Sequence, residues 1–165
     1  MNQQRKLTQR RMRLLLSLVL LLAIPVVAQP QPAPYFSGLW IQDNDRCQPK
    51  RNGNVTLHID QHEPELTVET SISHGTNSQH AIQKYTTDGR ASASTRVDGD
   101  EFHTAVAWKG SSLALSIEEH ESDRILRSSE TWSLIENGTT LRRIREHANG
   151  ETQTLFYQRQ QRATK

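Results

Sequence analysis

Cysteine is almost absent from this chain, since Cys47 is the only one in 165 residues. A single thiol excludes an internal disulfide, so the domain must fold on its hydrophobic core alone, even in an oxidising compartment. We interpret Cys47 as a small buried or half-buried residue near a turn, because free cysteines usually behave as small apolar residues. An intermolecular bridge is the alternative.

Apolar residues are also scarce. Hydrophobic residues make up 34% of the chain and aromatic residues 5%, less than a typical globular domain contains. Such a chain is either disordered or builds β structure with one face open to water. The regular alternation of apolar and polar residues described below favours β structure.

A basic surface is missing once the first residues are set aside. Five of the 20 basic residues, and none of the 18 acidic ones, precede residue 29, which leaves 15 basic against 18 acidic residues. Nucleic-acid binding needs clustered Lys and Arg, so no nucleic-acid partner is predicted.

Residues 1–28 have the pattern of a secretory signal. Basic residues are followed by an apolar run that ends at Val27, and then by a small-residue cleavage pattern that ends at Ala28. The run is shorter than the ~20 residues of a membrane span and contains Pro25. We predict cleavage after Ala28 and a secreted or periplasmic protein with no other membrane contact. An uncleaved membrane anchor is the alternative.

The rest of the chain predicts one β domain. Residues 29–34 form a Pro-rich spacer, and residues 35–160 alternate with period two between turn signals roughly 8–12 residues apart. About ten candidate strands in this pattern predict an all-β, up-and-down antiparallel meander of about 8–10 strands, closed or nearly closed as a barrel. A sandwich is the alternative. The loop over residues 44–54 is too short for a helical lid.

Individual turns predict finer detail. Asp88-Gly89 has the composition of a hairpin turn, and a short strand is expected over residues 91–97. A two-residue loop at Asn137-Gly138 would create three favourable cross-strand pairs, which a slip of one residue would lose together. These pairs are Leu134 with Leu141, Trp132 with Arg143, and Glu130 with Arg145. If Asn149-Gly150 is the next two-residue loop, Phe156 also faces Arg143, and we take this face as the interior.

The stretch Gly38-Leu39-Trp40 resembles the first strand of lipocalins and fatty-acid-binding proteins, the calycin group. The resemblance implies a barrel that the tryptophan closes at one end, so Gly38 and Trp40 are expected to be structural. It also implies a basic residue from a late strand over the indole, for which Arg143 and Arg145 are the candidates. The opening Phe-Ser-Gly-x-Trp is similar to that of small secreted bacterial proteins.

The last strand, residues 154–159, looks like that of fatty-acid-binding proteins. That family has an Arg two places before the Tyr, which holds the carboxylate of the ligand, and this chain has Leu155 there. The resemblance therefore does not imply a carboxylate clamp at that position.

Catalytic and metal motifs are poorly represented. The seven histidines include no His-x-His pair, and His62-Glu63-Pro64 cannot be the helical zinc-protease motif. No Gly-x-Ser-x-Gly nucleophile elbow occurs. We therefore predict a protein that is not an enzyme and holds no metal or cofactor. A hydrolase built from a spatial His/Asp site is the least favoured alternative.

The predicted function is binding of a small hydrophobic or anionic ligand inside the barrel. The predicted ligand-binding residues are Phe102, Trp108, Trp132, Leu134, Arg143, Arg145 and Phe156. An inward arginine either stacks on an indole beside the counter-charge of Glu130 or contacts an anionic head group. The alternative function is a cell-envelope interaction or structural module with a filled core and no pocket.

Overall fold

The computed structural model describes residues 34–92, 95–97, 100–121 and 123–160, which form eleven strands and one 3₁₀ turn. In chain order these are β1 (Gly38–Gln42), β2 (Asn54–His62), β3 (Glu65–His74), β4 (Asn77–Thr86), β5 (Asp88–Ala91), β6 (Thr95–Val97), β7 (Asp100–Lys109), β8 (Ser112–His120), β9 (Ile125–Ile135), η2 (Glu136–Gly138), β10 (Thr140–Glu146) and β11 (Thr152–Arg159). The predicted signal, and the spacer up to residue 33, lie outside these ranges. Within the ranges, no helix is long and apolar enough to cross a bilayer.

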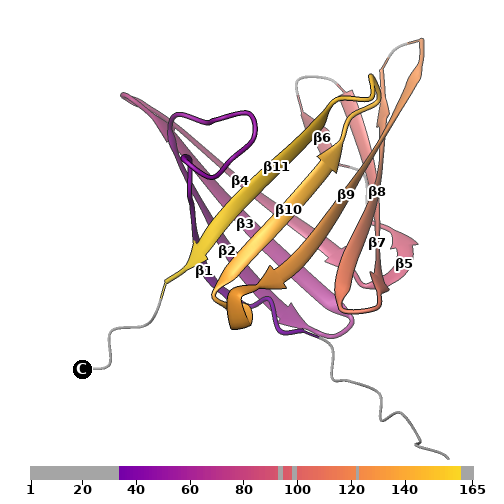
Figure 1. Ribbon diagram of the computed structural model, residues 1–165. Helices are drawn as coiled ribbons and strands as arrows, with labels where there is room; N and C mark the ends of the chain where they lie inside the picture. The colour runs from indigo at the N-terminus through magenta and orange to yellow at the C-terminus, as the bar shows by residue number, and fades with distance from the viewer. Residues whose placement is uncertain (1–33, 93–94, 98–99, 122, 161–165) are drawn as a thin grey trace, which may run out of the picture. The chain divides into compact units, whose positions relative to one another are not determined.

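The strands form an antiparallel meander that curves into a nearly closed barrel (Figure 1). Neighbours in the chain pair from β1 to β4 and from β7 to β11, and β1 pairs with β11. β4 and β5 stand at the two ends of this order. β4 contacts β5 and β7, but the described residues show no backbone ladder across that gap. The predicted all-β up-and-down barrel is confirmed.

Alternation decides which side chains face the interior. In β2, Leu57 and Ile59 are buried while His58 and Asp60 are exposed, and burial in β8 alternates in the same way. Side chains along a strand point to opposite faces with period two. Each strand therefore has one face buried in the core and one face exposed to solvent. A small number of apolar residues is enough to fill the core.

The structure corrects the expectations around Asp88. β5 ends at Ala91 and β6 begins at Thr95, with Ser92 in neither strand, and in the described residues no hairpin joins β4 to β5, because β5 pairs with β7 instead. The Asp88 carboxylate accepts a hydrogen bond from the Thr86 hydroxyl at 2.8 Å and one from the Arg90 backbone N–H at 3.1 Å. These local bonds of an Asp side chain stabilise a bend rather than a hairpin.

The register around Asn137-Gly138 is confirmed, including all three predicted pairs. Asn137 and Gly138 have φ of 56° and 83°, as a tight hairpin of this kind needs. The next loop is different, because the backbone of His147 bonds to that of Glu151 and leaves a three-residue loop with Gly150 at φ 85°. The added residue shifts the register by one.

That shift reverses the prediction for Phe156. Arg143 pairs with Leu155, and Phe156 pairs with Arg142 on the outer face. The Phe156 ring lies under the guanidinium of Arg46, 4.5 Å from the ring centroid. The expectation that Phe156 lines the interior is wrong, because a slip of one residue moves every side chain of a strand to the opposite face.

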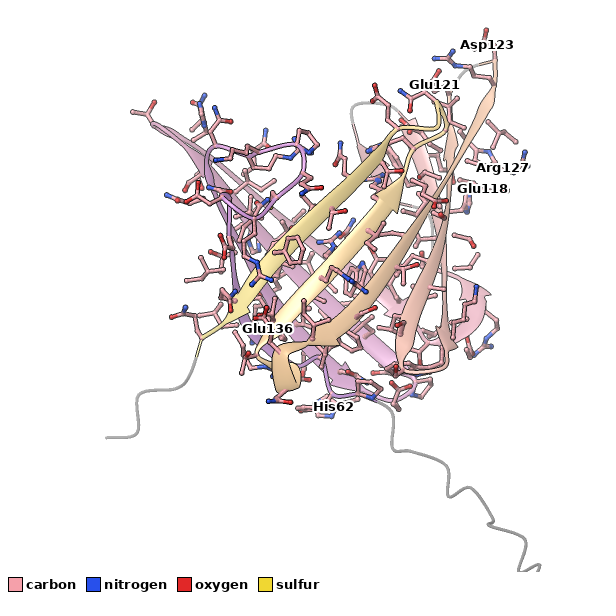
Figure 2. The ribbon with its side chains drawn as sticks, viewed as in Figure 1. His62, Glu118, Glu121, Asp123, Arg127 and Glu136 are labelled. Atoms are coloured by element: carbon pink, nitrogen blue, oxygen red, sulfur yellow. The ribbon has the colours of Figure 1, made fainter. Side chains whose placement is uncertain are left out.

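The two ends of the barrel differ (Figure 2). His62 and Glu136 lie at one end, which we call the closed end, and Glu121 and Asp123 lie at the other, which we call the mouth. The closed end is filled by an aromatic cluster, in which the Phe36 ring lies 6.0 Å from Trp108 and 6.5 Å from Trp132.

Trp40 closes this end, fully buried, with its indole N–H donating to the Phe36 carbonyl at 2.9 Å. The basic residue over the indole is Arg159, whose guanidinium carbon lies 4.2 Å from the ring centroid. The expectation of Arg143 or Arg145 there is wrong, because both lie on β10, which does not pair with β1, whereas Arg159 lies directly opposite Trp40 on β11.

Arg159 also connects the last strand to the segment before β1 and to η2. Its guanidinium donates to the carbonyls of Ser37 at 2.6 Å, Tyr35 at 2.9 Å and Gly138 at 3.0 Å. Gly38 has φ 143°, and a Cβ there would lie 3.2 Å from a nitrogen of Arg159. Glycine is therefore needed both for its backbone conformation and for the close approach of the guanidinium.

Cys47 is buried, as predicted. Its thiol donates to the Asp43 carbonyl at 3.2 Å and accepts from the Gln42 amide at 3.4 Å. The loop between β1 and β2 that contains it has no helix and is joined to β11 by a bridge between Gln48 and Thr154.

Trp40→Ala is expected to lower the free energy of unfolding by ~3–5 kcal/mol, because it empties the closed end and removes the surface on which Arg159 stacks. Urea denaturation followed by fluorescence measures this. Leu39→Ala is the matched control, because the neighbouring Leu39 points outward and is 42% exposed, and it should cost under ~1 kcal/mol. Equal costs for the two variants would contradict the closing role of Trp40.

Candidate functional site

A cavity of about 280 Å³ lies inside the barrel, between the closed end and the mouth. Five of its lining residues are aromatic or aliphatic: Tyr85, Phe102, Leu115, Ile117 and Trp132. The other six are polar or charged: Gln83, Ser92, Thr104, Glu130, Arg143 and Arg145. The cavity therefore has a mixed lining, with aromatic and aliphatic side chains beside a charged group on one side, and both kinds of lining are found in sites for small organic molecules.

Strand register builds the charged side in two levels. Trp132 and Arg143 face each other on β9 and β10, and Glu130 and Arg145 face each other two residues nearer the mouth. Residues two apart on a strand share a face, so all four side chains point inward.

Glu130 is the centre of this group, and only 3% of it is exposed. Its carboxylate accepts one hydrogen bond from the Trp132 indole N–H at 2.8 Å and another from Nε of Arg143. Burial acts to raise the pKa of the Glu130 carboxyl, but the charges of Arg143 and Arg145 and these hydrogen bonds outweigh burial and lower that pKa. Glu130 is therefore ionised at neutral pH.

The charge of Arg143 is already paired within the protein. Its guanidinium carbon lies 4.6 Å from the Trp132 ring centroid and 5.7 Å from that of Tyr157. Burial acts to lower the pKa of Arg143, but the Glu130 carboxylate raises it overall. Of the two roles considered for an inward arginine, Arg143 has the structural one, because its charge is already neutralised by a buried partner.

Arg145 differs from Arg143 in this respect. It lines the same cavity, yet in the described part of the chain its buried Nε has no hydrogen-bond partner. A buried donor without a partner carries a free-energy cost that a bound acceptor would remove. Its charge also acts on the Glu130 carboxylate opposite it, and because its Nε lines the cavity without a partner, Arg145 is the candidate contact for a ligand.

Tyr85 adds a hydroxyl group on the opposite wall. Burial raises the pKa of its phenol to about 12, although Arg143 acts in the other direction. The phenol is neutral at physiological pH and can donate a hydrogen bond into the cavity.

Four of the seven predicted ligand-binding residues line this cavity: Phe102, Trp132, Arg143 and Arg145. Trp108 and Leu134 are inward but pack against the core of the closed end, and Phe156 lies outside. The other seven lining residues were not among the predicted ligand-binding residues: Gln83, Tyr85, Ser92, Thr104, Leu115, Ile117 and Glu130. Alternation assigns each residue of a strand to one of the two faces of the sheet. In β4 the two faces are similar in polarity, so the sequence did not indicate that Tyr85 and Gln83 point inward.

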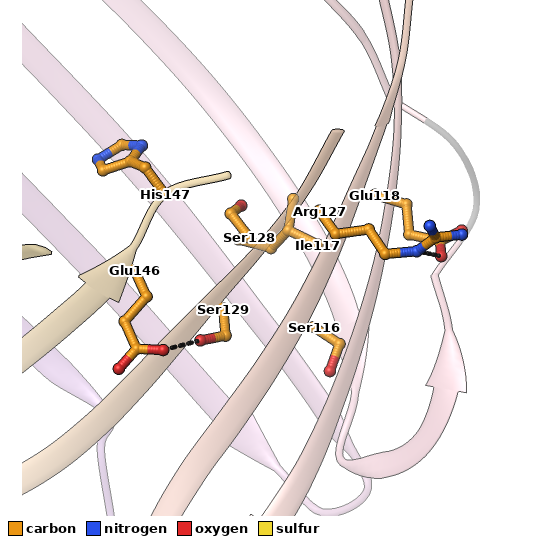
Figure 3. Close-up of a pocket in the computed structure, with 8 residues that line it drawn as sticks. All are labelled: Ser116, Ile117, Glu118, Arg127, Ser128, Ser129, Glu146 and His147. Carbon is orange, nitrogen blue, oxygen red and sulfur yellow. Dashed lines mark hydrogen bonds and ion pairs between the residues drawn. The ribbon is translucent and has the colours of Figure 1, made fainter. Parts of the chain in front are cut away.

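A groove of about 320 Å³ on the outer wall is a weaker candidate (Figure 3). Arg127 donates to the Glu118 carboxylate at 2.9 Å, and the Ser129 hydroxyl donates to Glu146 at 3.3 Å. The groove is open, its arginine is paired with Glu118, and Glu146 accepts from Ser129, so it offers no unpaired cation to a ligand.

Sequence comparison finds no matching family model and no matching curated protein. Structure comparison finds the same fold in a REP1-NXSQ fatty acid transporter, with a TM-score of 0.59 and 14% identity over 77% of this chain and 97% of that one. Secretory abundant heat soluble protein 4 from Ramazzottius varieornatus gives a TM-score of 0.59 and 15% identity, over 81% and 100% of the two chains. Human cRBP IV gives 0.56 and 17%, over 78% and 100%. The chain therefore shares the antiparallel barrel fold of these proteins.

Glu130→Gln is expected to lower the free energy of unfolding by about 3–5 kcal/mol, because it leaves the buried guanidinium of Arg143 without its counter-charge. Urea denaturation at pH 7 measures this. Glu118→Gln is the matched control, since Glu118 pairs with Arg127 on the exposed outer wall of the neighbouring strand, and its urea midpoint should stay near the wild-type value. Because the folded pKa of Glu130 is lowered, the wild type should lose this stability as the pH falls below ~4, the ordinary value for Glu.

Tyr85→Phe is expected to flatten the loss of stability at alkaline pH. The unfolded phenol ionises near its ordinary pKa of 10.0, whereas the folded one stays neutral until about 12. The stability that Tyr85 contributes is therefore complete below pH 10 and is lost between pH 10 and 12. Urea midpoints of both proteins at pH 8, 10 and 11.5 test this, and parallel pH profiles would contradict the burial of the phenol.

Proposed function

We propose that this protein is an exported, non-enzymatic barrel that binds a small, partly hydrophobic molecule in its interior cavity. The observation that carries the proposal is an interior cavity of mixed lining in which the buried Nε of Arg145 has no hydrogen-bond partner among the described residues. Nε of Arg142 on the outer face is also buried without a partner, but Arg145 differs from it in lining the cavity. A bound molecule with a hydrogen-bond acceptor would supply one.

The volume limits the ligand. At about 280 Å³, the cavity is at the lower end of the ~300–1,000 Å³ range of small-molecule sites. It suits a molecule of up to about three rings or a medium-length chain rather than a larger hydrophobic molecule.

Two further observations support this proposal. The fold is that of a protein described as a fatty acid transporter, which suggests the same class of ligand here. The basic and apolar leader in residues 1–28 supports export, with action outside the cytoplasm.

The alternative, an envelope module without a ligand, also has an observation in its favour. Side chains fill the closed end, where Phe36, Trp40 and Leu141 are fully buried. The two functions differ in what they predict for the cavity nearer the mouth, so binding experiments separate them.

An anionic hydrophobic dye, 1-anilinonaphthalene-8-sulfonate, is expected to bind the purified protein saturably with one site. Arg145→Met should weaken this binding ~10-fold or more, since a hydrogen bond to a charged group contributes about 1.5–3 kcal/mol. Dye fluorescence titrations measure both affinities.

Arg142→Met is the matched control, because Arg142 is on the same strand and faces outward. Its affinity for the dye should equal that of the wild type. Non-saturable fluorescence, or equal losses in the two variants, would favour the module without a ligand.

A further inference from the structure

Two neighbouring strands of the outer wall carry the same short pattern, a glutamate two places before a histidine. The residues are Glu101 and His103 on β7 and Glu118 and His120 on β8. In the antiparallel ladder Glu101 lies opposite His120, and His103 lies opposite Glu118. Phe102, between the two residues on β7, lines the interior cavity, so alternation turns Glu101 and His103 outward, together with their cross-strand partners. Each histidine therefore has one glutamate beside it along the strand and another across the ladder.

The two imidazole rings are in contact, with their centroids 4.8 Å apart. Nε2 of His103 lies 3.5 Å from Oε1 of Glu101, and Nε2 of His120 lies 3.7 Å from Oε2 of Glu118. Both separations exceed the ~2.9 Å of a normal N–H···O hydrogen bond. In the described part of the chain, Nε2 of His120 is buried and has no hydrogen-bond partner. These contacts are therefore looser than hydrogen-bonded ion pairs.

The separations are instead close to those between two ligands of one metal ion. Zn²⁺ binds imidazole nitrogens at ~2.0–2.1 Å and carboxylate oxygens at ~2.0–2.2 Å, so two such ligands of a tetrahedral ion lie ~3.4 Å apart. The 3.5 Å between Glu101 and His103 matches this value. Neutral imidazole is the commonest metal ligand in proteins and suits first-row transition metals.

The two glutamates have different roles. Arg127 donates to the Glu118 carboxylate at 2.9 Å (Figure 3), and this hydrogen bond is the main cause of the lowered pKa of the Glu118 carboxyl. Binding of a metal through Glu118 would have to break that pair. Glu101 lies beside His103 and opposite His120, so its carboxylate is the better third ligand, and Glu118 adds a negative charge nearby.

The site needs a change of side-chain rotamers before a metal can bind. In the described residues, no group of three such side chains is already arranged to hold an ion. The four side chains are 34–42% exposed, so they can rotate without disturbing the core. The β7–β8 ladder fixes the backbone beneath them, which keeps the two histidines together.

We propose that the outer wall binds one divalent first-row transition metal ion of the Zn²⁺ class through His103, His120 and Glu101, with water in the fourth position. The site lies on the opposite face of β7 and β8 from the interior cavity, so it is independent of the proposed ligand binding. It departs from the sequence prediction of no metal. The histidines lie on different strands, and only the pairing of β7 with β8 brings them together.

Isothermal titration calorimetry of the purified, tag-free protein with ZnCl₂ at about pH 7 is expected to show one saturable site of 1:1 stoichiometry. An excess of Mg²⁺ should not displace the zinc, because Mg²⁺ prefers a shell of oxygen ligands. Co²⁺ in place of Zn²⁺ should give the visible absorption of four-coordinate cobalt, a signature that a general attraction of cations to glutamates would not produce.

His103→Asn and His120→Asn should each weaken Zn²⁺ binding ~100-fold or more, since loss of even an outer partner of a metal ligand costs about 10–100-fold. Glu101→Gln should weaken it at least ~10-fold. His58→Asn is the matched control, because His58 also lies on the outer wall, 3.5 Å from Glu69, on a strand that does not neighbour β7 or β8. This variant should bind Zn²⁺ as the wild type does.

Each contrary result overturns a different part of the proposal. Equal Zn²⁺ binding by the wild type and by the double variant His103→Asn/His120→Asn overturns the site itself. An equal loss in His58→Asn overturns its location. A smaller loss in Glu101→Gln than in Glu118→Gln overturns the choice of the third ligand. Failure of the metal site would leave dye binding in the interior unchanged, so the proposed function is tested separately.

Discussion

The stacking of Arg159 on Trp40 holds the barrel together at the point where its first and last strands meet. The guanidinium covers the indole at 4.2 Å and donates to carbonyls before β1 and in η2. The chain has no internal disulfide, and this contact acts together with the backbone ladder between β1 and β11, which joins residues more than a hundred positions apart. Burial of the indole and satisfaction of three backbone carbonyls depend on this one side chain, so pairing of the first and last strands and filling of the closed end form a single constraint.

Once the closed end is fixed, the interior is divided along its length. Trp132 and Arg143 form a level of aromatic surface and charge on one side of the barrel, and Glu130, one level nearer the mouth, pairs with both. Below this level the side chains pack as a core, and above it the cavity opens. A buried ion pair is weak evidence for stability. Here it separates a filled end from a hollow one and leaves Arg145 on the hollow side, where its charge faces the mouth.

Much of the fold was predictable from local chemistry. Period-two alternation identified the strands, and Asn137-Gly138 set the β9–β10 register, because a tight hairpin turn fixes pairing within a few residues. The same reasoning failed at Asn149-Gly150, where the loop has three residues and Phe156 turns outward. It failed at Asp88-Gly89, where hydrogen bonds of the Asp88 side chain replaced a hairpin. Turn composition shows where a turn occurs but not always how many residues it contains.

The sequence by itself determined the all-β meander, the buried state of Cys47, the closing role of Trp40 and the inward position of Arg143 and Arg145, since these follow from alternation, turn signals and the resemblance of the first strand. Only the tertiary structure decided which arginine lies over Trp40, that Tyr85 faces the interior, and that Arg143 is committed while Arg145 is not. These facts depend on pairing between strands far apart in the chain, such as β1 with β11. Local patterns contain no information about such pairing, because it is fixed by closure of the whole sheet.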